Sequence, residues 1–227
     1  MTNLKALIFG AHPDDGEIFA GGTLCALRAA GADVTLVIAT DGSLSLGPPA
    51  NDDLAARRKQ EAAAAAKILD VKIEMLGFRD GYLSMASEAM AAVNAILERE
   101  QPDLVITHHP QDTHRDHREI SRLVTARVRE TQRYMYLEPI YGTVAQPNIV
   151  IDTSAHWERK LAAVREHKTQ DLERHVIPGM ETWNKFRALQ LGARGVTHAE
   201  GFIIPGGLTM LSPVKMLEKI AKTRVLY

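Results

Sequence analysis

Residues 6–17 read ALIFGAHPDDGE, a short apolar run followed directly by a histidine and three carboxylates. The run Ala6–Phe9 predicts a buried parallel strand, so that His12, Asp14 and Asp15 lie where this strand ends. Ligands of open α/β folds bind outside the carboxyl ends of the strands. This stretch therefore predicts a functional site at one edge of a parallel sheet.

A second polar cluster stands in the same relation to a strand. Residues 109–117 read HPQDTHRDH and follow the apolar run Leu104–Thr107. Histidine and carboxylate clusters at two strand ends are the expected form of a metal site assembled across a parallel sheet. Either cluster alone is also compatible with a solvated loop that contains capping aspartates, and their coincidence favours the metal site.

The residue types in the two clusters are those that zinc binds. Zinc takes imidazole nitrogen and carboxylate oxygen, and catalytic zinc sites use three protein ligands and leave the fourth position for water. His12 and Asp15 are three residues apart at a loop that turns into a helix, and His117 supplies a third ligand. Asp14 then stands beside the metal as a free general base. We expect one zinc ion per chain, for which other divalent metals can substitute.

Composition excludes several function classes. The chain has 227 residues, 45% hydrophobic and 24% charged, as in an ordinary soluble globular protein. A formal net charge of −1 gives no overall field for nucleic acid or an anionic membrane. No run approaches the ~20 apolar residues that span a bilayer, and no signal-peptide pattern opens the chain. Cys25, the single cysteine, is expected to pack as a small hydrophobe. We predict a cytoplasmic protein with neither a nucleic-acid partner nor a membrane insertion.

Strand and helix patterns alternate along the chain and predict the α/β class. We expect a single domain over residues 1–227, with a mostly parallel sheet and helices on both faces. Residues 1–135 form its core, and residues 136–227 complete the sheet and the substrate pocket. The expected strands are Leu4–Gly10, Val34–Ala39, Lys72–Leu76, Leu104–Thr107, Arg133–Leu137 and Asn148–Ile151, with a short segment at Gly201–Pro205. The expected helices are Gly21–Ala30, Asp52–Leu69, Ser87–Arg99, Glu119–Arg129, Ala155–Gln170, Met180–Leu191 and Pro213–Lys222.

Several other polar residues have both a functional and a structural interpretation. Arg58 lies near a helix start, where it either turns into the site to bind substrate oxygens or stays solvated and pairs with Glu61. Asp41 follows a strand and either contacts substrate or forms a turn with Gly42. Glu17 either orients His12 or acts as a favourable charge in the first turn of a helix. The polar loop Ser43–Asp53 is a candidate lid.

The motifs also carry a family resemblance. AHPDDGE and AGGT in residues 11–23, together with HPQDTHRDH, resemble the PIG-L/LmbE-like family of zinc-dependent N-deacetylases. Smaller matches are similar to the family's other segments: Arg58–Glu61, the Asp80-Gly81 turn, residues 166–170 (EHKTQ) and residues 198–202 (HAEGF). Thr169 stands where the family usually has serine. The matches span nearly the whole chain.

The resemblance implies a Rossmann-like sheet and hydrolysis of an N-acetyl group on a small amino-sugar substrate. It implies His12, Asp15 and His117 as zinc ligands and Asp14 as the base. His114 is implied as the electrophilic histidine, protonated and tuned by the neighbouring Asp116. The resemblance adds Arg58, His167 and Glu200 as substrate-binding residues, and a homo-oligomer, a trimer or a hexamer.

Three other functions compete with this one. A metallophosphoesterase is suggested by Asp116-His117, although two-metal phosphoesterases use more bridging carboxylates. A nucleotide-binding module is suggested by Gly10 and Gly16 after a strand, but Asp14 and Asp15 put negative charge where a pyrophosphate binds. A metal-binding protein without turnover leaves Asp14 without a role.

Overall fold

The computed structural model describes residues 4–45, 51–128, 133–139, 146–170, 172–206 and 213–226. Its strands are β1 (Lys5–Gly10), β2 (Asp33–Thr40), β3 (Lys72–Phe78), β4 (Leu104–Thr107), β5 (Arg133–Leu137), β6 (Ile149–Asp152), β7 (Ala199–Ile203) and β8 (Thr223–Val225). Its helices are α1 (Asp15–Ala29), α2 (Asp52–Leu69), α3 (Ser87–Glu100), α4 (Arg115–Val128), α5 (Trp157–Val164), α6 (Ile177–Leu191) and α7 (Val214–Leu217). A 3-10 turn, η1 (Ser154–His156), precedes α5, and a π-helical segment, η2 (Leu172–Val176), precedes α6.

All eight strands join one sheet in the order β3-β2-β1-β4-β5-β7-β6-β8. The first five strands of this order are parallel, and β7, β6 and β8 are added antiparallel. The chain order reverses between β1 and β4, which lie side by side with Phe9 paired to Thr107. In doubly wound sheets this switch point opens the crevice in which ligands bind. Both polar clusters therefore emerge into the same crevice.

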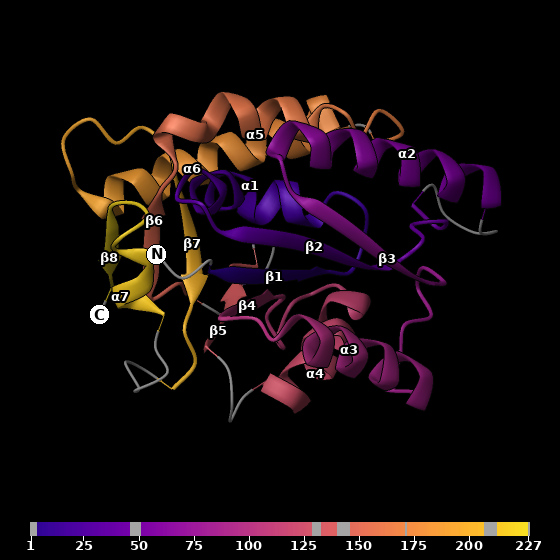
Figure 1. The fold of residues 1–227 in the computed structure, drawn as a ribbon. Helices are drawn as coiled ribbons and strands as arrows, with labels where there is room; N and C mark the ends of the chain where they lie inside the picture. Colours follow the sequence, from indigo (N-terminus) through magenta and orange to yellow (C-terminus); the bar gives the residue numbers. More distant parts are fainter. Residues whose placement is uncertain are drawn as a thin grey trace.

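Side-chain alternation along each strand feeds two separate hydrophobic cores. Ala6 and Ile8 of β1 pack toward α1 and α2, and Leu7 and Phe9 pack toward α3 and α4. Figure 1 shows α1, α2 and α5 on one side of the sheet and α3 and α4 on the other. The predicted α/β class, with a mostly parallel sheet covered on both faces, is confirmed.

The helices that carry the polar motifs begin earlier than the sequence predicts. α1 begins at Asp15 and not at Gly21, and α4 begins at Arg115 and not at Glu119. Glycine disfavours helix, but close packing requires it in α1. A Cβ atom on Gly16 would lie 2.6 Å from Leu36, and one on Gly22 would lie 2.5 Å from Thr153. The early starts place Asp15 and His117 in first helical turns.

The C-terminal third differs more from the prediction. α5 ends at Val164, so that residues 165–170 form turns and not the expected helix. The helix expected at Pro213–Lys222 is the single turn α7, and the unpredicted strand β8 then pairs with β6. Within the candidate lid Ser43–Asp53, residues 46–50 lie outside the described residues.

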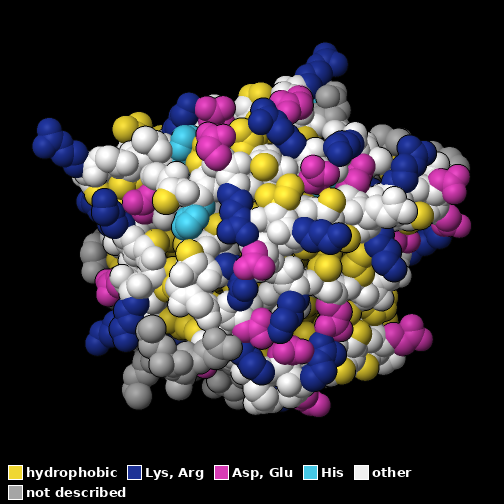
Figure 2. Space-filling view, turned by 45° about the horizontal axis from the view of Figure 1, so that its top comes forward, with side chains coloured by type: hydrophobic (Ala, Val, Ile, Leu, Met, Phe, Trp, Pro, Cys, Tyr) yellow, Lys and Arg dark blue, Asp and Glu magenta, His cyan; other side chains and the backbone are white. Residues whose placement is uncertain are grey.

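Surface chemistry agrees with the balanced composition. Basic and acidic side chains are interspersed on the face shown in Figure 2, so this face carries no field of a single sign. Across the described ranges, none of the helices combines the length and the apolar character needed to cross a membrane.

Candidate active site

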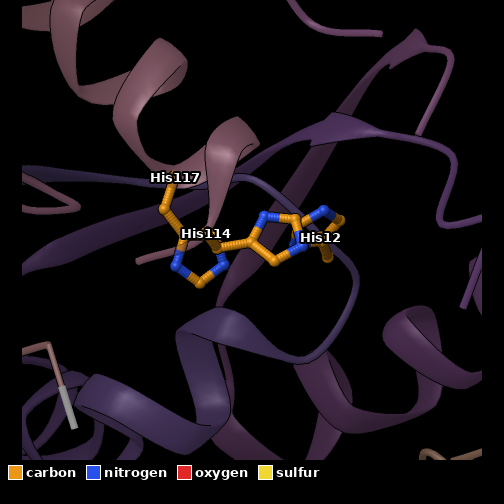
Figure 3. Close-up of side chains that lie close together, drawn as sticks. All are labelled: His12, His114 and His117. Carbon is orange, nitrogen blue, oxygen red and sulfur yellow. The ribbon is translucent and has the colours of Figure 1, made fainter. Parts of the chain in front are cut away.

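The loop after β1 and the first turn of α4 bring together the three predicted metal ligands. His12 Nδ1 lies 3.5 Å from Asp15 Oδ2, and His117 Nε2 lies 3.4 Å from Asp15 Oδ1. The His12 and His117 ring centroids are 5.3 Å apart, and all three side chains are buried. Figure 3 shows the side chains of His12, His114 and His117 lying close together.

Asp15 fixes the loop that carries His12. Its Oδ2 accepts hydrogen bonds of 2.8 Å from the backbone N–H of Ala11 and of His12, and lies 3.0 Å from His108 Nε2. Burial opposes ionisation of this carboxyl, but the charge of His117 and the hydrogen bond with His108 hold its pKa well below the usual range. Asp15 is thus an ionised carboxylate whose position is set by the backbone of its own loop.

Each predicted histidine ligand presents its other ring nitrogen to a carboxylate. His117 Nδ1 lies 3.1 Å from Asp112 Oδ2, and His12 Nε2 lies 3.3 Å from Asp80 Oδ1 and 3.5 Å from Asp116 Oδ2. Metal-binding histidines are oriented in this way by an outer carboxylate. Ligand atoms lie within 4.8 Å of one another in three groups of the described residues: His12 with His114 and His117, Asp15 with His108 and His117, and His12 with Asp80 and Asp116. Imidazole nitrogens and carboxylate oxygens suit a divalent cation such as zinc, and the particular ligand set His12, Asp15 and His117 stays a prediction.

The same carboxylates make these imidazoles basic. Burial lowers the pKa of His117, yet Asp15 and Asp112 raise it to about 9. Burial likewise opposes a charge on His12, but its contacts with Asp116, Asp15 and Asp80 hold its pKa well above the ordinary value. A metal ligand must be a neutral imidazole, so metal binding displaces protons here. The cluster attracts positive charge, whether protons or a cation.

Asp14 stands beside this cluster in an unusual backbone conformation. Its φ is 130°, a value that few non-glycine residues adopt. The buried Arg58 holds Asp14 in this conformation. Arg58 Nη2 lies 3.2 Å from Asp14 Oδ2 and donates a hydrogen bond of 2.5 Å to the carbonyl oxygen of Pro13. Arg58 Nη1 donates a hydrogen bond of 3.1 Å to the carbonyl oxygen of Gly42. Burial raises the pKa of Asp14 to about 6, although Arg58 opposes the rise. Near neutral pH this carboxylate is poised to accept a proton.

The structure excludes the solvated interpretation of Arg58, while binding of substrate oxygens by Arg58 stays a prediction. Its guanidinium is buried against the motif loop and lines a cavity, so it is not a solvated arginine. Glu61 does not pair with it but accepts hydrogen bonds from the backbone N–H and the hydroxyl of Thr169, at 2.9 and 2.7 Å. Arg58 and Glu61 therefore serve separate contacts.

His114 lies in the cluster, but not in the protonation state expected from the resemblance. Its Nδ1 accepts a hydrogen bond of 3.2 Å from the backbone N–H of Asp116, which a protonated Nδ1 cannot do. Burial and the neighbouring His12 and His117 lower its pKa. The Asp116 carboxylate accepts from the backbone N–H of Gly81 at 2.7 Å and faces His12. This geometry favours a neutral His114 that carries its proton on Nε2.

Glu17 and His167 face each other beneath the site. Glu17 Oε1 lies 3.5 Å from His167 Nε2, and both side chains are buried. Burial lowers the pKa of His167, but the Glu17 carboxylate outweighs this effect and raises it. Because His12 Nε2 faces Asp80 and not Glu17, the expectation that Glu17 orients His12 does not agree with the contacts.

Asp41 and Glu200 bind other parts of the protein. Asp41 Oδ1 accepts from the backbone N–H of Ser43 and of Asp80, so it forms the turn and holds the Asp80 loop. The buried Glu200 accepts hydrogen bonds from Thr23 and the middle of α1, and its Oε1 lies 2.7 Å from Lys160 Nζ. These contacts connect the two residues to the framework, and their role in substrate binding stays a prediction.

Three side chains of the site are not among the candidate residues that the sequence indicates. Asp80 and Asp112 are the outer carboxylates of the two histidines, and His108 stacks on His117 with a centroid distance of 3.7 Å. Burial and the charge of His117 lower the pKa of His108 to about 4, so it is neutral. Asp80 lies in the Asp80-Gly81 turn and Asp112 in the HPQDTHRDH motif. Which histidine nitrogen each carboxylate faces depends on the tertiary structure, and no spacing in the sequence indicates it.

Two cavities meet at His114. The polar cavity, of about 410 Å³, is lined by His12, Asp14, Arg58, Asp80, His114 and Gln170 among others. The apolar cavity, of about 320 Å³, has a wall of Ile18, Phe19 and Val176, and reaches the cluster at Asp15, His114 and His117. The cluster thus has an open approach from two sides of different chemistry.

Comparison with known proteins gives a consistent picture. The family model described as PIG-L, GlcNAc-PI de-N-acetylase, matches residues 7–128. Diacetylchitobiose deacetylase of Thermococcus kodakarensis is 32% identical over 232 residues, which cover 92% of this chain and 86% of that protein. The solved structure of N,N'-diacetylchitobiose deacetylase from Pyrococcus horikoshii has a TM-score of 0.76 at 28% identity and covers 95% of this chain and 89% of that one.

One further solved structure shows that the fold does not decide the chemistry. GalB, the 4-carboxy-2-hydroxymuconate hydratase from Pseudomonas putida, has a TM-score of 0.81 and covers 91% of this chain and 98% of that one, but is only 20% identical. At that identity the likeness concerns the fold alone. Function has to be argued from the side chains of the site.

Proposed function

This chain belongs to the PIG-L family, and we propose that it is a zinc-dependent hydrolase that removes the N-acetyl group from a small amino sugar. The observation that carries the proposal is the position of Asp14. A buried carboxylate, fixed by Arg58, stands beside the mutually close side chains of His12, Asp15 and His117, to which we assign one metal ion. This is the arrangement that hydrolysis of an amide by an activated water requires.

A zinc ion bound by His12, Asp15 and His117 would lower the pKa of a water molecule and polarise the amide carbonyl. Asp14 accepts a proton from the attacking water as the new C–O bond forms. Asp14 then returns that proton to the nitrogen when the C–N bond breaks. Water and amide become a carboxylic acid and an amine, which are released as carboxylate and ammonium after a proton passes between them, and Asp14 ends in its starting state.

His114 supports the same reaction as a hydrogen-bond donor. Its Nδ1 accepts from the backbone, so that the proton is carried by Nε2. A neutral N–H donor stabilises the negative charge that develops on the carbonyl oxygen without being consumed. Asp116 positions this residue through its backbone N–H and holds His12 through its carboxylate.

An amino sugar suits the polar cavity. Arg58, Asp80 and Gln170 line it with donors and acceptors for sugar hydroxyls, next to Asp14. Ser45 donates a hydrogen bond of 2.7 Å to Gln170, so this wall is held in place across the cavity. Two relatives that match 92% and 95% of this chain are named for diacetylchitobiose, which makes the same substrate class the first choice for this chain.

Acetate release from N-acetylglucosamine and N,N'-diacetylchitobiose tests the proposal. We expect release that stops after metal chelation and returns with zinc. His117→Ala should lose both bound zinc and activity. Hydrolysis of a phosphodiester in place of the amide would favour the phosphoesterase alternative, and acetate release unaffected by chelation would refute the metal assignment.

Two further proposals rest on the family resemblance. We propose that the protein acts in the cytoplasm and assembles as a homo-oligomer, a trimer or a hexamer. Sedimentation velocity of the purified protein tests the assembly, and a monomer at micromolar concentration would contradict it.

A further inference from the structure

The apolar cavity is larger than the hydrolysis of an acetamide needs. A methyl group fills about the volume of one water molecule, roughly 30 Å³, whereas this cavity measures about 320 Å³. We propose that it is an acyl pocket, and that the enzyme hydrolyses N-acyl amino sugars with acyl chains longer than acetyl. This inference rests on the deacetylase function proposed above and names the range of its substrates.

The position of the base determines which cavity receives which half of the amide. Asp14 lines the polar cavity, and it must reach the leaving nitrogen to return its proton. The nitrogen and its sugar therefore lie on the Asp14 side. The acyl carbon continues on the opposite side of the carbonyl, where Asp15 and His117 open into the apolar cavity. His114 lines both cavities. This position is expected of a residue that contacts the amide carbonyl, because the carbonyl would lie between the two cavities.

The chemistry of the two walls leads to the same assignment. Sugar hydroxyls placed against Ile18, Phe19 and Val176 would lose hydrogen bonds to water without replacement. An alkyl chain in that place loses none and buries apolar surface. The polar groups of this cavity, among them Asp15, Asp112 and His117, already contact one another within the cluster.

The wall is also firmly built and continuous with the cluster. Phe19 packs edge-on against the rings of His108 and His117, with centroid distances of 5.5 and 6.0 Å. Ile18 belongs to a small hydrophobic core that also contains Trp157 and Leu172. An acyl chain leaving the carbonyl would therefore meet an ordered apolar surface at once.

The direct test is a series of glucosamine N-acyl derivatives with acetyl, butanoyl and hexanoyl groups, assayed with the zinc-loaded protein. We expect kcat/KM to rise with chain length, by up to about fourfold for each methylene that the pocket buries. A kcat/KM that falls at each added methylene would overturn the proposal. A flat acyl series combined with a preference for octyl glycosides would also overturn it, because the cavity would then hold the aglycone.

Substitutions at Val176 should change the ratio of the hexanoyl to the acetyl rate constants in opposite directions. Val176→Phe fills the cavity and should lower the ratio at least tenfold, whereas Val176→Ala widens the cavity and should raise it. Leu44→Phe adds a side chain of the same size to the polar cavity and should affect both substrates by the same factor. Arg174→Ala, at an exposed position in the same segment η2, should leave the ratio unchanged. A ratio insensitive to Val176 would contradict the assignment.

Binding of the products separates this inference from the proposed function. Calorimetry of the zinc-loaded protein should show hexanoate binding at least tenfold more tightly than acetate, and Val176→Phe should abolish the difference. If no amide is hydrolysed but hexanoate is preferred in this way, the deacetylase function fails and the acyl pocket stands. If N-acetylglucosamine is hydrolysed but acetate and hexanoate bind equally, the acyl pocket fails and the function stands.

Discussion

Asp14 occupies a backbone conformation that its neighbours impose. A non-glycine residue at a φ of 130° carries about 1–3 kcal/mol of strain. Arg58 offsets that strain with hydrogen bonds to the carbonyls of Pro13 and Gly42, on either side of the site. Strain of this kind persists where it aims a functional group, and here it aims the carboxylate that we propose as the base.

Exchanging each of the two adjacent aspartates separates chemistry from metal binding. Asp14→Asn should retain zinc and lose about 10²–10⁴-fold in kcat, because it removes the base but no ligand. Asp15→Asn should lose zinc, since it removes a ligand and weakens the anchor of the loop. Metal analysis and steady-state kinetics on both variants check this. An Asp14→Asn protein without zinc would exchange the two roles.

Arg58→Lys tests the positioning of Asp14. Lysine keeps the charge but cannot contact Asp14, Pro13 and Gly42 at once. We expect kcat to fall about 10–100-fold, as for other residues that orient a catalytic group, with unchanged zinc content. A change confined to KM would show instead that Arg58 binds substrate and does not position the base.

For individual residues, the sequence predicted the contacts that follow from which strands are neighbours in the sheet. His12, Asp15 and His117 meet because β1 and β4 are neighbours at the switch point. The outer carboxylates Asp80 and Asp112 were missed, since which ring nitrogen a carboxylate faces depends on side-chain packing. Glu17 lies in the first turn of α1, as its structural interpretation expects, and it faces His167, a contact that no spacing in the sequence indicates.

Gly22 in α1 and Gly179 in α6 allow a matched test of how closely a helix is packed. Gly22→Ala in α1 would bring a Cβ within 2.5 Å of Thr153 and should destabilise the fold by about 1–3 kcal/mol. Gly179→Ala in α6 meets nothing within 4 Å and should stabilise it by up to about 1 kcal/mol. Urea unfolding of both variants measures the difference. Equal effects of the two substitutions would contradict the close packing of α1 on the sheet.

The buried pair of Lys160 and Glu200 joins α5 to β7 and α1. Lys160→Met leaves a buried carboxylate without its cation and should cost about 3–5 kcal/mol of unfolding free energy. If Glu200 acts only in the framework, KM of the folded variant stays at the wild-type value. A raised KM with an unchanged melting temperature would return Glu200 to the substrate-binding residues.

The predicted boundaries of helices and strands are wrong where tertiary packing overrides the local conformational preference of the residues. The apolar runs of β1, β2 and β4 were recognisable because buried parallel strands are nearly all hydrophobic. The first turn of α1 was not recognisable, because Gly16 disfavours helix until the sheet is present. The strand β8 has only three residues and gains its stability from β6.

Cys25 reports on the unfolding of the whole molecule. It is fully buried, and burial raises the pKa of its thiol to about 11. At pH 8 the native protein should therefore not react with a thiol reagent, and the reaction should appear only as urea unfolds the chain. Labelling should follow the loss of circular dichroism. Rapid labelling of the native protein would show that α1 separates locally from the sheet.

The central claim is a single zinc ion at His12, Asp15 and His117 that serves amide hydrolysis. Titration of metal-free protein with zinc, with acetate release followed at each step, tests it most directly. Activity should rise linearly with added zinc and reach its plateau at one equivalent of zinc per chain. A plateau at two equivalents, or acetate release without added metal, would contradict it.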